Sequence, residues 1–152
     1  MGQCLAGQGL YAEALELDLE MLERMRRVHG DTDHAGVATA LGNLAFRLRS
    51  VGRPRDALAH YREALAMTLR LEPENRARVT MYRNNIAACL VALGRTTEAL
   101  PELQEVLAER RRLHAGDHGS VATSLNNLGN CLERMGRPAQ ALVYYDEALE
   151  MR

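Results

Sequence analysis

The chain has 152 residues and a net charge of −1, and 47% of its residues are apolar. This apolar content is enough for a folded core and argues against disorder, while the near-neutral charge gives no support to nucleic-acid binding. No run of about 18 apolar residues exists, so no membrane span is predicted. Three cysteines without a signal peptide indicate a reduced, cytoplasmic protein.

The first residues match the end of a helix that recurs later in the chain. Residues 2–5 (GQCL) align with residues 129–132 (GNCL), and Gly9 then takes the place of a turn. We therefore expect residues 1–33 to be a partial unit, made of the end of a first helix, a turn at Gly9 and a second helix. This expectation implies a segment of a longer protein.

One eight-residue sequence marks the same turn in every unit. Its copies are QGLYAEAL at 8–15, VGRPRDAL at 51–58, LGRTTEAL at 93–100 and MGRPAQAL at 135–142. A fixed period of 42 or 43 residues is typical of stacked helical repeats. We expect units at 34–75 and 76–117 and a truncated unit at 118–152.

Each unit predicts two helices joined at its glycine. The first helix carries an apolar stripe with steps of four and three, as in Val121, Leu125, Leu128, Leu132 and Met135. The second helix opens with Pro54 or Pro138, because a missing N–H costs nothing in a first helical turn. The loops between units carry predicted N-caps at Asp33, Asn75 and Asp117.

The whole pattern resembles the tetratricopeptide repeat, with its turn glycine and with alanines seven residues apart, as in Ala57/Ala64 and Ala141/Ala148. The 42-residue period, against the usual 34, and the segments VATSLNNLG, EALEMR and LHAGDH are similar to the kinesin-light-chain subtype. The resemblance implies an all-α fold, a right-handed α-solenoid of helix-turn-helix repeats. It also implies a non-catalytic module whose first helices line a concave groove for an extended peptide or a partner domain.

Three residues depart from the repeat pattern. Arg83 stands where the other units have Leu41 and Leu125, and Arg47 stands where the others have cysteine. We expect Arg83 to weaken or redirect the packing of the middle unit. Pro101 lies inside a second helix, which we expect it to kink or to make start later.

Asparagine recurs at one position of the first helix, although it is a mediocre helix former. A carboxamide can both donate hydrogen bonds to and accept them from a peptide backbone, whatever side chains that peptide carries. This column of asparagines, one at the equivalent position of each repeat, therefore predicts contacts to a peptide in the groove that the resemblance implies. The alternative is that these amides bond to each other or to backbone between units. The candidate groove residues are Asn43, Asn84, Asn85, Asn126, Asn127 and Asn130, with Arg49 and Arg134 for acidic groups of the partner.

Cys4, Cys89 and Cys131 also share one column, which raises a metal or redox interpretation. Stacked helices lie roughly 8–10 Å apart, which is too far for a disulfide, and one thiol per unit cannot form a compact tetrahedral site. We interpret the cysteines as small packing residues. Histidines and aspartates recur as loop residues, so we expect no metal or other cofactor there: His29, His114, His118, Asp31, Asp33 and Asp117.

A second function class stays open. The last predicted helix has an apolar face with no following helix to cover it, formed by Ala141, Leu142, Tyr145, Ala148 and Leu149. The alternative function is therefore a self-assembling scaffold or oligomerisation segment of a larger multidomain protein, associating through this C-terminal helix. An enzyme is not expected, because the sequence lacks a phosphate loop, a nucleophile elbow and an HExxH motif.

Overall fold

The computed structural model describes residues 2–30, 32–113 and 119–151, with side chains from Glu13 onward. Within these ranges the chain forms seven α-helices: α1 (Gly2–His29), α2 (Ala35–Ser50), α3 (Pro54–Leu71), α4 (Arg76–Ala92), α5 (Thr96–Leu113), α6 (Gly119–Arg134) and α7 (Pro138–Glu150). The helices form two compact units, Met1–Asn75 with α1 to α3 and Arg76–Arg152 with α4 to α7.

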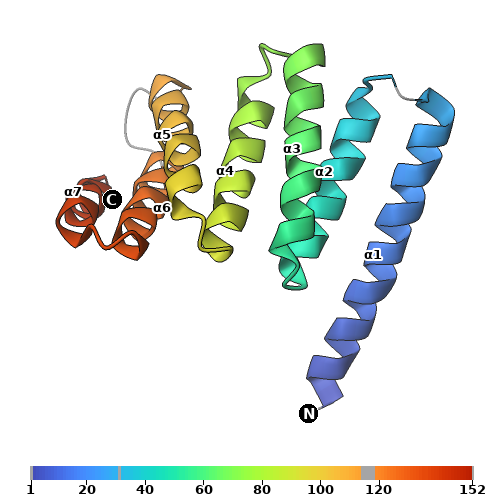
Figure 1. The fold of residues 1–152 in the computed structure, drawn as a ribbon, viewed down its shortest axis with the longest axis horizontal. Helices are drawn as coiled ribbons and strands as arrows, with labels where there is room; N and C mark the ends of the chain where they lie inside the picture. The colour runs from blue at the N-terminus through green and yellow to red at the C-terminus, as the bar shows by residue number, and fades with distance from the viewer. Residues whose placement is uncertain (1, 31, 114–118, 152) are drawn as a thin grey trace. The chain divides into compact units, whose positions relative to one another are not determined.

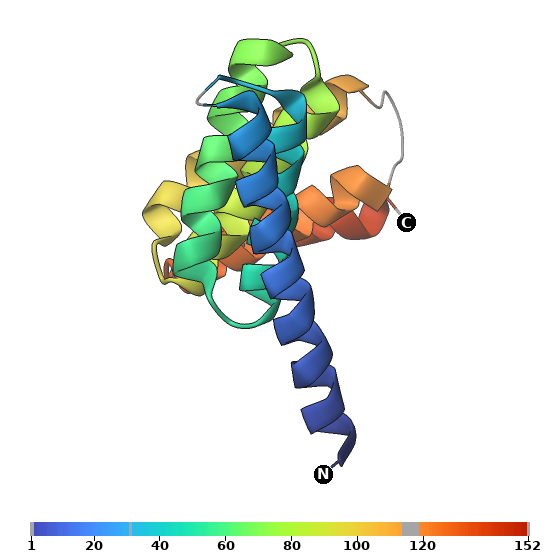
Figure 2. The ribbon, with the colours of Figure 1, turned by 90° about the vertical axis from the view of Figure 1, so that its right-hand side faces the viewer.

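In the first unit, α2 packs against both α1 and α3 (Figure 1). Apolar residues at steps of four and three share one face of α2, and that face is buried: Val37, Leu41, Leu44 and Leu48. The N-terminal end of α1 extends beyond the turn that joins α2 to α3 (Figure 2). In the C-terminal half of α1, Leu22 is buried in the core of this unit.

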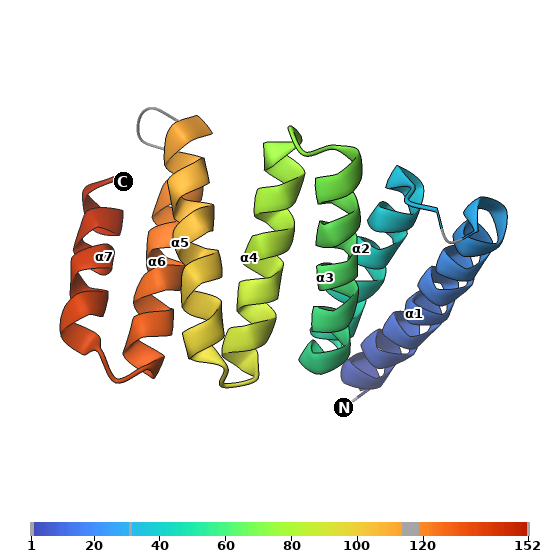
Figure 3. The same ribbon diagram turned by 45° about the horizontal axis from the view of Figure 1, so that its top comes forward.

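In the second unit, each helix from α4 to α7 packs against the next one along the chain (Figure 3). The stripe predicted for α6 is confirmed as core, because four of its five members are buried: Val121, Leu125, Leu128 and Leu132. Met135, the fifth member, is half-buried at the end of the helix. From α5, Leu103, Val106 and Leu107 complete the apolar layer.

Gly52, Gly94 and Gly136 close the three hairpins α2–α3, α4–α5 and α6–α7 in the left-handed backbone region. Their φ angles are 78°, 74° and 73°, which a residue with a Cβ rarely adopts. After each glycine, an arginine donates its backbone N–H to a leucine carbonyl of the first helix at 2.8–2.9 Å: Arg53 to Leu48, Arg95 to Leu90 and Arg137 to Leu132. The glycine turns predicted from the repeat are thus confirmed.

The turn predicted at Gly9 is wrong, because Gly2–His29 form one continuous helix. About two helical turns precede Gly9, and so short a helix gains too little by packing back on its neighbour to offset the entropy of ordering a hairpin. A glycine inside a helix costs only about 1 kcal/mol. Continuing the helix is therefore the more stable arrangement.

The N-cap predicted at Asp33 is also wrong. His34 caps α2, and its Nδ1 accepts a hydrogen bond from the Gly36 N–H at 3.0 Å. Asp33 instead accepts from Arg70 of α3, whose Nη2 lies 2.7 Å from Oδ1. This hydrogen bond lowers the pKa of the Asp33 carboxyl.

Pro54 and Pro138 behave as predicted, whereas one of the two outcomes expected from Pro101 is wrong. Pro54 and Pro138 stand in the first turn of α3 and α7. Pro101 lies inside α5, yet α5 begins at Thr96, in register with the other two prolines, so the predicted later start is wrong. Pro101 is exposed and lies near the start of the helix, where its missing N–H removes a single backbone hydrogen bond.

Arg83 and Arg47, which break the leucine and cysteine columns, each pair with a carboxylate. In the second unit, Arg83 Nη1 of α4 donates to Glu102 Oε2 of α5 at 2.8 Å. In the first unit, Arg47 of α2 forms an ion pair with Asp18 of α1. Both pairs are part-buried: the carboxylate side chains are 25% and 18% exposed, and the arginine side chains are 30% and 38% exposed. Arg83 is thus redirected from the core toward a charged partner.

Candidate binding groove

The helices α4 and α6, which are the first helices of two successive repeats, border a hollow of about 200 Å³. Its floor is apolar and its rim carries carboxamides. The lining residues are Asn84, Ala87, Ala88 and Val91 of α4, Leu103 of α5, and Asn127 and Asn130 of α6. The hollow depends on small side chains, because larger residues in place of Ala87 and Ala88 would fill it.

Two of the predicted groove residues bond to each other across this hollow. Asn127 Nδ2 donates to Asn84 Oδ1 at 3.2 Å, and both side chains are half-buried. The alternative predicted for the column, amides bonded to each other, therefore holds for this pair. Each carboxamide still has spare groups, since Asn127 keeps its oxygen and Asn84 keeps both of its N–H groups.

Arg134 lies beside the same hollow. Its Nη1 donates to the backbone carbonyl of Val91 at 3.3 Å, close to the C-terminal end of α4, where a cation is favoured by the helix dipole. The side chain is exposed, and its remaining N–H groups face no acidic partner among the described residues. The structure thus brings together Asn84, Asn127, Asn130 and Arg134.

The other predicted residues lie outside the hollow. Asn85 and Asn126 are half-buried on α4 and α6 but do not line it. Asn43 and Arg49 belong to α2 of the first unit. There Asn43 is exposed, and the Arg49 guanidinium carbon lies 5.8 Å from the centroid of the exposed Phe46 ring, a cation–π contact.

The apolar floor of the hollow was not predicted from the sequence, because the prediction rested on the spacing of the asparagines alone. Ala87 and Ala88 are adjacent small residues one helical turn after Asn84, and this spacing places them on the same side of α4. Leu103 comes from the preceding second helix, α5, and no feature of the first-helix sequences indicates it. Only the two alanines offered a readable signal.

The described cysteines are packing residues. Cys89 and Cys131 are fully buried free thiols, and Cys131 Sγ lies 3.4 Å from the Thr96 carbonyl oxygen. Burial raises the pKa of the Cys131 thiol, so it stays protonated and is a poor nucleophile or metal ligand. The side chain of Cys4 lies outside the described residues.

Within the described ranges, no three His, Cys, Asp or Glu side chains gather in a way that could hold a metal ion. His29 and His34 stack with ring centroids 3.5 Å apart, and His34 Nδ1 is already occupied as the cap of α2. In the same ranges, every helix is too short or too polar to span a bilayer. The remaining loop residues raised by the sequence lie outside the described part: Asp31, His114, Asp117 and His118.

The sequence and the fold were compared with known proteins. A family model described as tetratricopeptide repeat matches residues 1–70 and 78–152, whereas no curated protein matches the sequence. Among solved structures, BtubC (BKLC) of P. vanneervenii is similar, with 27% identity and a TM-score of 0.83 over 95% of this chain. The chain spans 57% of the length of BtubC.

Two further structures share the fold at lower identity. The nearly identical repeats of a protein described as a kinesin light chain of Podosopora anserina align with a TM-score of 0.82 and 19% identity, covering 95% of this chain and 68% of that one. Bacillus thuringiensis PlcR, solved in complex with the peptide PapR7 and DNA, aligns with a TM-score of 0.73 and 16% identity, covering 93% and 49%. The predicted class, an all-α solenoid of helix-turn-helix repeats, is confirmed.

Proposed function

Because the chain belongs to the tetratricopeptide-repeat family, whose members are protein–protein interaction modules, we propose that it binds an extended segment of a partner protein in the hollow between α4 and α6. One observation carries the proposal. The hollow combines two carboxamides that keep unused hydrogen-bonding groups with an apolar floor. The function is non-catalytic recognition.

An extended peptide offers the two kinds of group that this hollow can take. Its backbone presents N–H and C=O groups alternately, so Asn84 can donate to a peptide carbonyl while Asn127 accepts from a peptide N–H. Alternate side chains of the peptide point the same way, and an apolar one facing the hollow would be buried against Ala88 and Leu103. Burial of apolar area then supplies affinity, and the amides fix the register.

Arg134 adds a preference for acidic segments. It lies beside the hollow with an exposed guanidinium, and a carboxylate of the partner would form a charge-assisted hydrogen bond with it. The pair would be exposed, so its contribution should fall as the salt concentration rises. PlcR, which shares the fold, was solved with a bound peptide, and this supports peptide binding as one use of such a fold.

The test uses a peptide selected on the wild-type chain from a library of random short peptides. Its affinity is measured for Asn84→Ala/Asn127→Ala, in which both partners of the half-buried amide pair are removed together. Removing both leaves no orphaned group, so stability should change little. Losing two backbone contacts of roughly 0.5–1.5 kcal/mol each should weaken binding by about tenfold or more.

Asn126→Ala is the matched control, because Asn126 lies on the same helix as Asn127 but does not line the hollow. It should bind like the wild type. Unchanged affinity of the double variant at unchanged thermal stability would refute the proposal. A large drop in its melting temperature would instead assign the amide pair a structural role.

Self-association through α7 is the second candidate, and one contrast favours it. Leu142 and Leu149 are 58% and 65% exposed, whereas Leu58 and Leu65, which hold the same repeat positions in α3, are 4% and 9% exposed.

Ala141 and Ala148, which were also predicted on the uncovered face, are buried, and Tyr145 is half-buried. Of the five predicted residues, Leu142 and Leu149 are therefore the exposed ones. We expect copies to associate through these two leucines, because exposed apolar faces on repeats are normally buried by a neighbour.

Sedimentation over a wide concentration range checks this second candidate. The wild type should show a reversible increase in mass, and Leu142→Gln/Leu149→Gln should abolish it while keeping the helical content. A wild type that stays monomeric at high concentration would remove self-association from consideration. Neither leucine lines the α4–α6 hollow, so this variant should keep its affinity for the selected peptide.

A further inference from the structure

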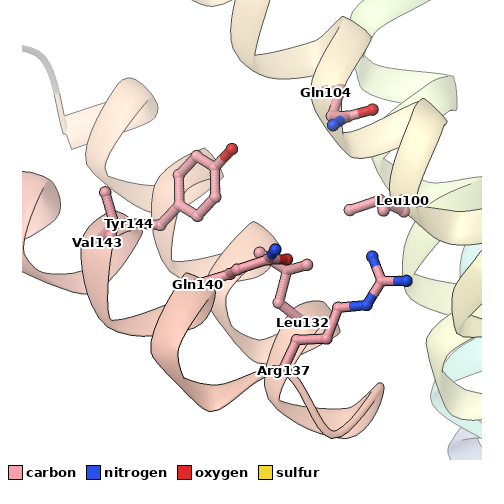
Figure 4. A pocket seen from close by; sticks show the side chains of 7 residues that line it. All are labelled: Leu100, Gln104, Leu132, Arg137, Gln140, Val143 and Tyr144. Atoms are coloured by element: carbon pink, nitrogen blue, oxygen red, sulfur yellow. The ribbon is translucent and has the colours of Figure 1, made fainter.

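A second hollow lies between the second helices of the same unit, α5 and α7 (Figure 4). Its volume is about 360 Å³, and none of its lining residues belongs to the α4–α6 hollow: Leu100, Gln104, Leu132, Arg137, Gln140, Val143 and Tyr144. Leu100 of α5 and Leu132 of α6 form apolar walls, and the ring of Tyr144 faces Gln104 across the opening (Figure 4).

Arg137, the cationic residue of this hollow, lacks the acidic partner that Arg53 and Arg95 have at the same position of the other two hairpin turns. Arg53 Nε lies 2.7 Å from Asp56 Oδ2, and the guanidinium of Arg95 donates twice to Glu98, at 2.7 Å in both bonds. The third turn has Gln140 in place of the acidic residue, so α7 carries no acidic side chain in its first turn.

Arg137 is exposed, as Arg53 and Arg95 are, but its guanidinium has no ion pair among the described residues. It extends from the start of α7 toward Leu100 on α5 (Figure 4). An unpaired cation beside apolar walls is complementary to a ligand that joins a carboxylate to an aliphatic group. The amides of Gln104 and Gln140 add donors and acceptors that suit a peptide bond.

We propose that this α5–α7 hollow is a second docking site, which takes a partner segment carrying an acidic side chain next to an aliphatic one. The carboxylate pairs with Arg137, in the way that Glu98 pairs with Arg95 within the chain. The aliphatic side chain lies against Leu100 and Leu132. The site goes beyond the proposed function, because it uses other residues and the second helices of the repeats.

The experiment titrates the full chain with two blocked peptides, acetyl-Leu-Glu-Val-amide and acetyl-Leu-Gln-Val-amide, and follows backbone amide signals by NMR. The Glu peptide should shift the signals of Leu100, Gln104 and Val143. It should bind about two- to fivefold more tightly than the Gln peptide, as expected for one solvent-accessible ion pair.

Two variants test whether the unpaired charge of Arg137 causes the preference. Arg137→Gln removes the charge, and Gln140→Glu supplies the internal carboxylate that the other two turns have, so both should abolish the preference for the Glu peptide. Arg95→Gln is the matched control in the preceding turn and should keep that preference. Asn84→Ala/Asn127→Ala should keep it too, which separates this site from the α4–α6 hollow.

Several results would overturn the proposal. These are equal affinity for the two peptides, no binding of either, signal shifts confined to residues outside the α5–α7 hollow, or a full preference retained by Arg137→Gln. The last experiment is a competition with butyrate, a free carboxylate with an aliphatic tail. If butyrate competes as strongly as the Glu peptide, the hollow is a site for small anions and the assignment to a peptide segment is wrong.

Discussion

Each unit holds a part-buried arginine–carboxylate pair, but the carboxylate finds its arginine on a different neighbouring helix. Asp18 of α1 lies nine residues after Gly9 and Glu102 of α5 lies eight residues after Gly94, so the two carboxylates hold adjacent repeat positions. In the first unit, Asp18 pairs with Arg47 of the following helix, α2. In the second unit, Glu102 pairs with Arg83 of the preceding helix, α4. The arginines come from different columns of the repeat.

This difference shows that charged residues enter the half-buried layer of this array in pairs. At the repeat position of Glu102, α3 has His60 and α7 has Tyr144, and the first helices of these hairpins keep Leu41 and Leu125 where α4 has Arg83. A partly buried charge without a partner is strongly unfavourable. A single departure from a repeat column is therefore best interpreted together with the residues that face it from both neighbouring helices.

The largest expected effect comes from breaking the pair of the second unit. Glu102→Ala leaves the Arg83 side chain, which is 30% exposed, without its carboxylate, and should cost about 1–3 kcal/mol in the free energy of unfolding. Arg83→Leu/Glu102→Ala should regain most of that loss, because leucine is what α2 and α6 have at this position. Urea unfolding measures both, and a double variant no more stable than Glu102→Ala would contradict the pairing.

A smaller effect is expected in the first unit. Asp18→Ala frees Arg47, whose side chain is already 38% exposed and can extend into water, so the loss should be about 1 kcal/mol or less. A double-mutant cycle with Arg47→Ala gives the coupling energy directly. A coupling energy larger than that of the Arg83–Glu102 pair would contradict the expectation that the ion pair of the second unit contributes more to stability.

His60, which holds the repeat position of Glu102 in α3, gives a pH-dependent test. Burial lowers the pKa of His60 below its ordinary 6.5, against the raising effect of Glu63 and Asp56 and with a further lowering by Arg26. The unfolded chain therefore binds a proton more readily, so stability is highest above the ordinary pKa and falls as the pH drops through it. The melting temperature should decrease between about pH 7 and about pH 5, and His60→Gln should decrease less.

The smallest effect concerns the start of α7. Gln140→Glu places a carboxylate three residues after Arg137 and in the first turn of the helix, where the helix dipole favours it, so it should stabilise by about 0.5 kcal/mol. Glu98→Gln, the reverse change at the start of α5, should lose a similar amount. Chemical denaturation measures both, and a destabilising Gln140→Glu would show that Arg137 does not reach the new carboxylate.

The repeat determined most of what could be predicted about the fold. The turns at Gly52, Gly94 and Gly136, the apolar stripes and the opening prolines of α3 and α7 follow from local rules of helix geometry and backbone conformation. The continuous α1 and the His34 cap were not predictable from the columns, because each depends on competition between two local arrangements. The Arg83–Glu102 pair was missed because it joins two helices and two columns.

The candidate sites were only partly readable from the sequence. Asparagine spacing indicated Asn84 and Asn127, but an apolar floor with a residue from another helix needs packing to define it. The unpaired Arg137 had a signal in the sequence. Comparing the residues three positions after Arg53, Arg95 and Arg137 shows two acids and one glutamine.

The three hairpin turns are closed by the same backbone hydrogen bond, and this affects how the number of repeats in such a chain can change. The leucine that accepts the arginine N–H lies five residues earlier in each of them, with distances of 2.8, 2.8 and 2.9 Å. A deletion that joins Gly52 directly to Arg95 would remove 42 residues and recreate the same turn, with Leu48 as the acceptor. Recombination between gene copies at these glycine turns would therefore add or remove one whole repeat and leave every apolar stripe in phase.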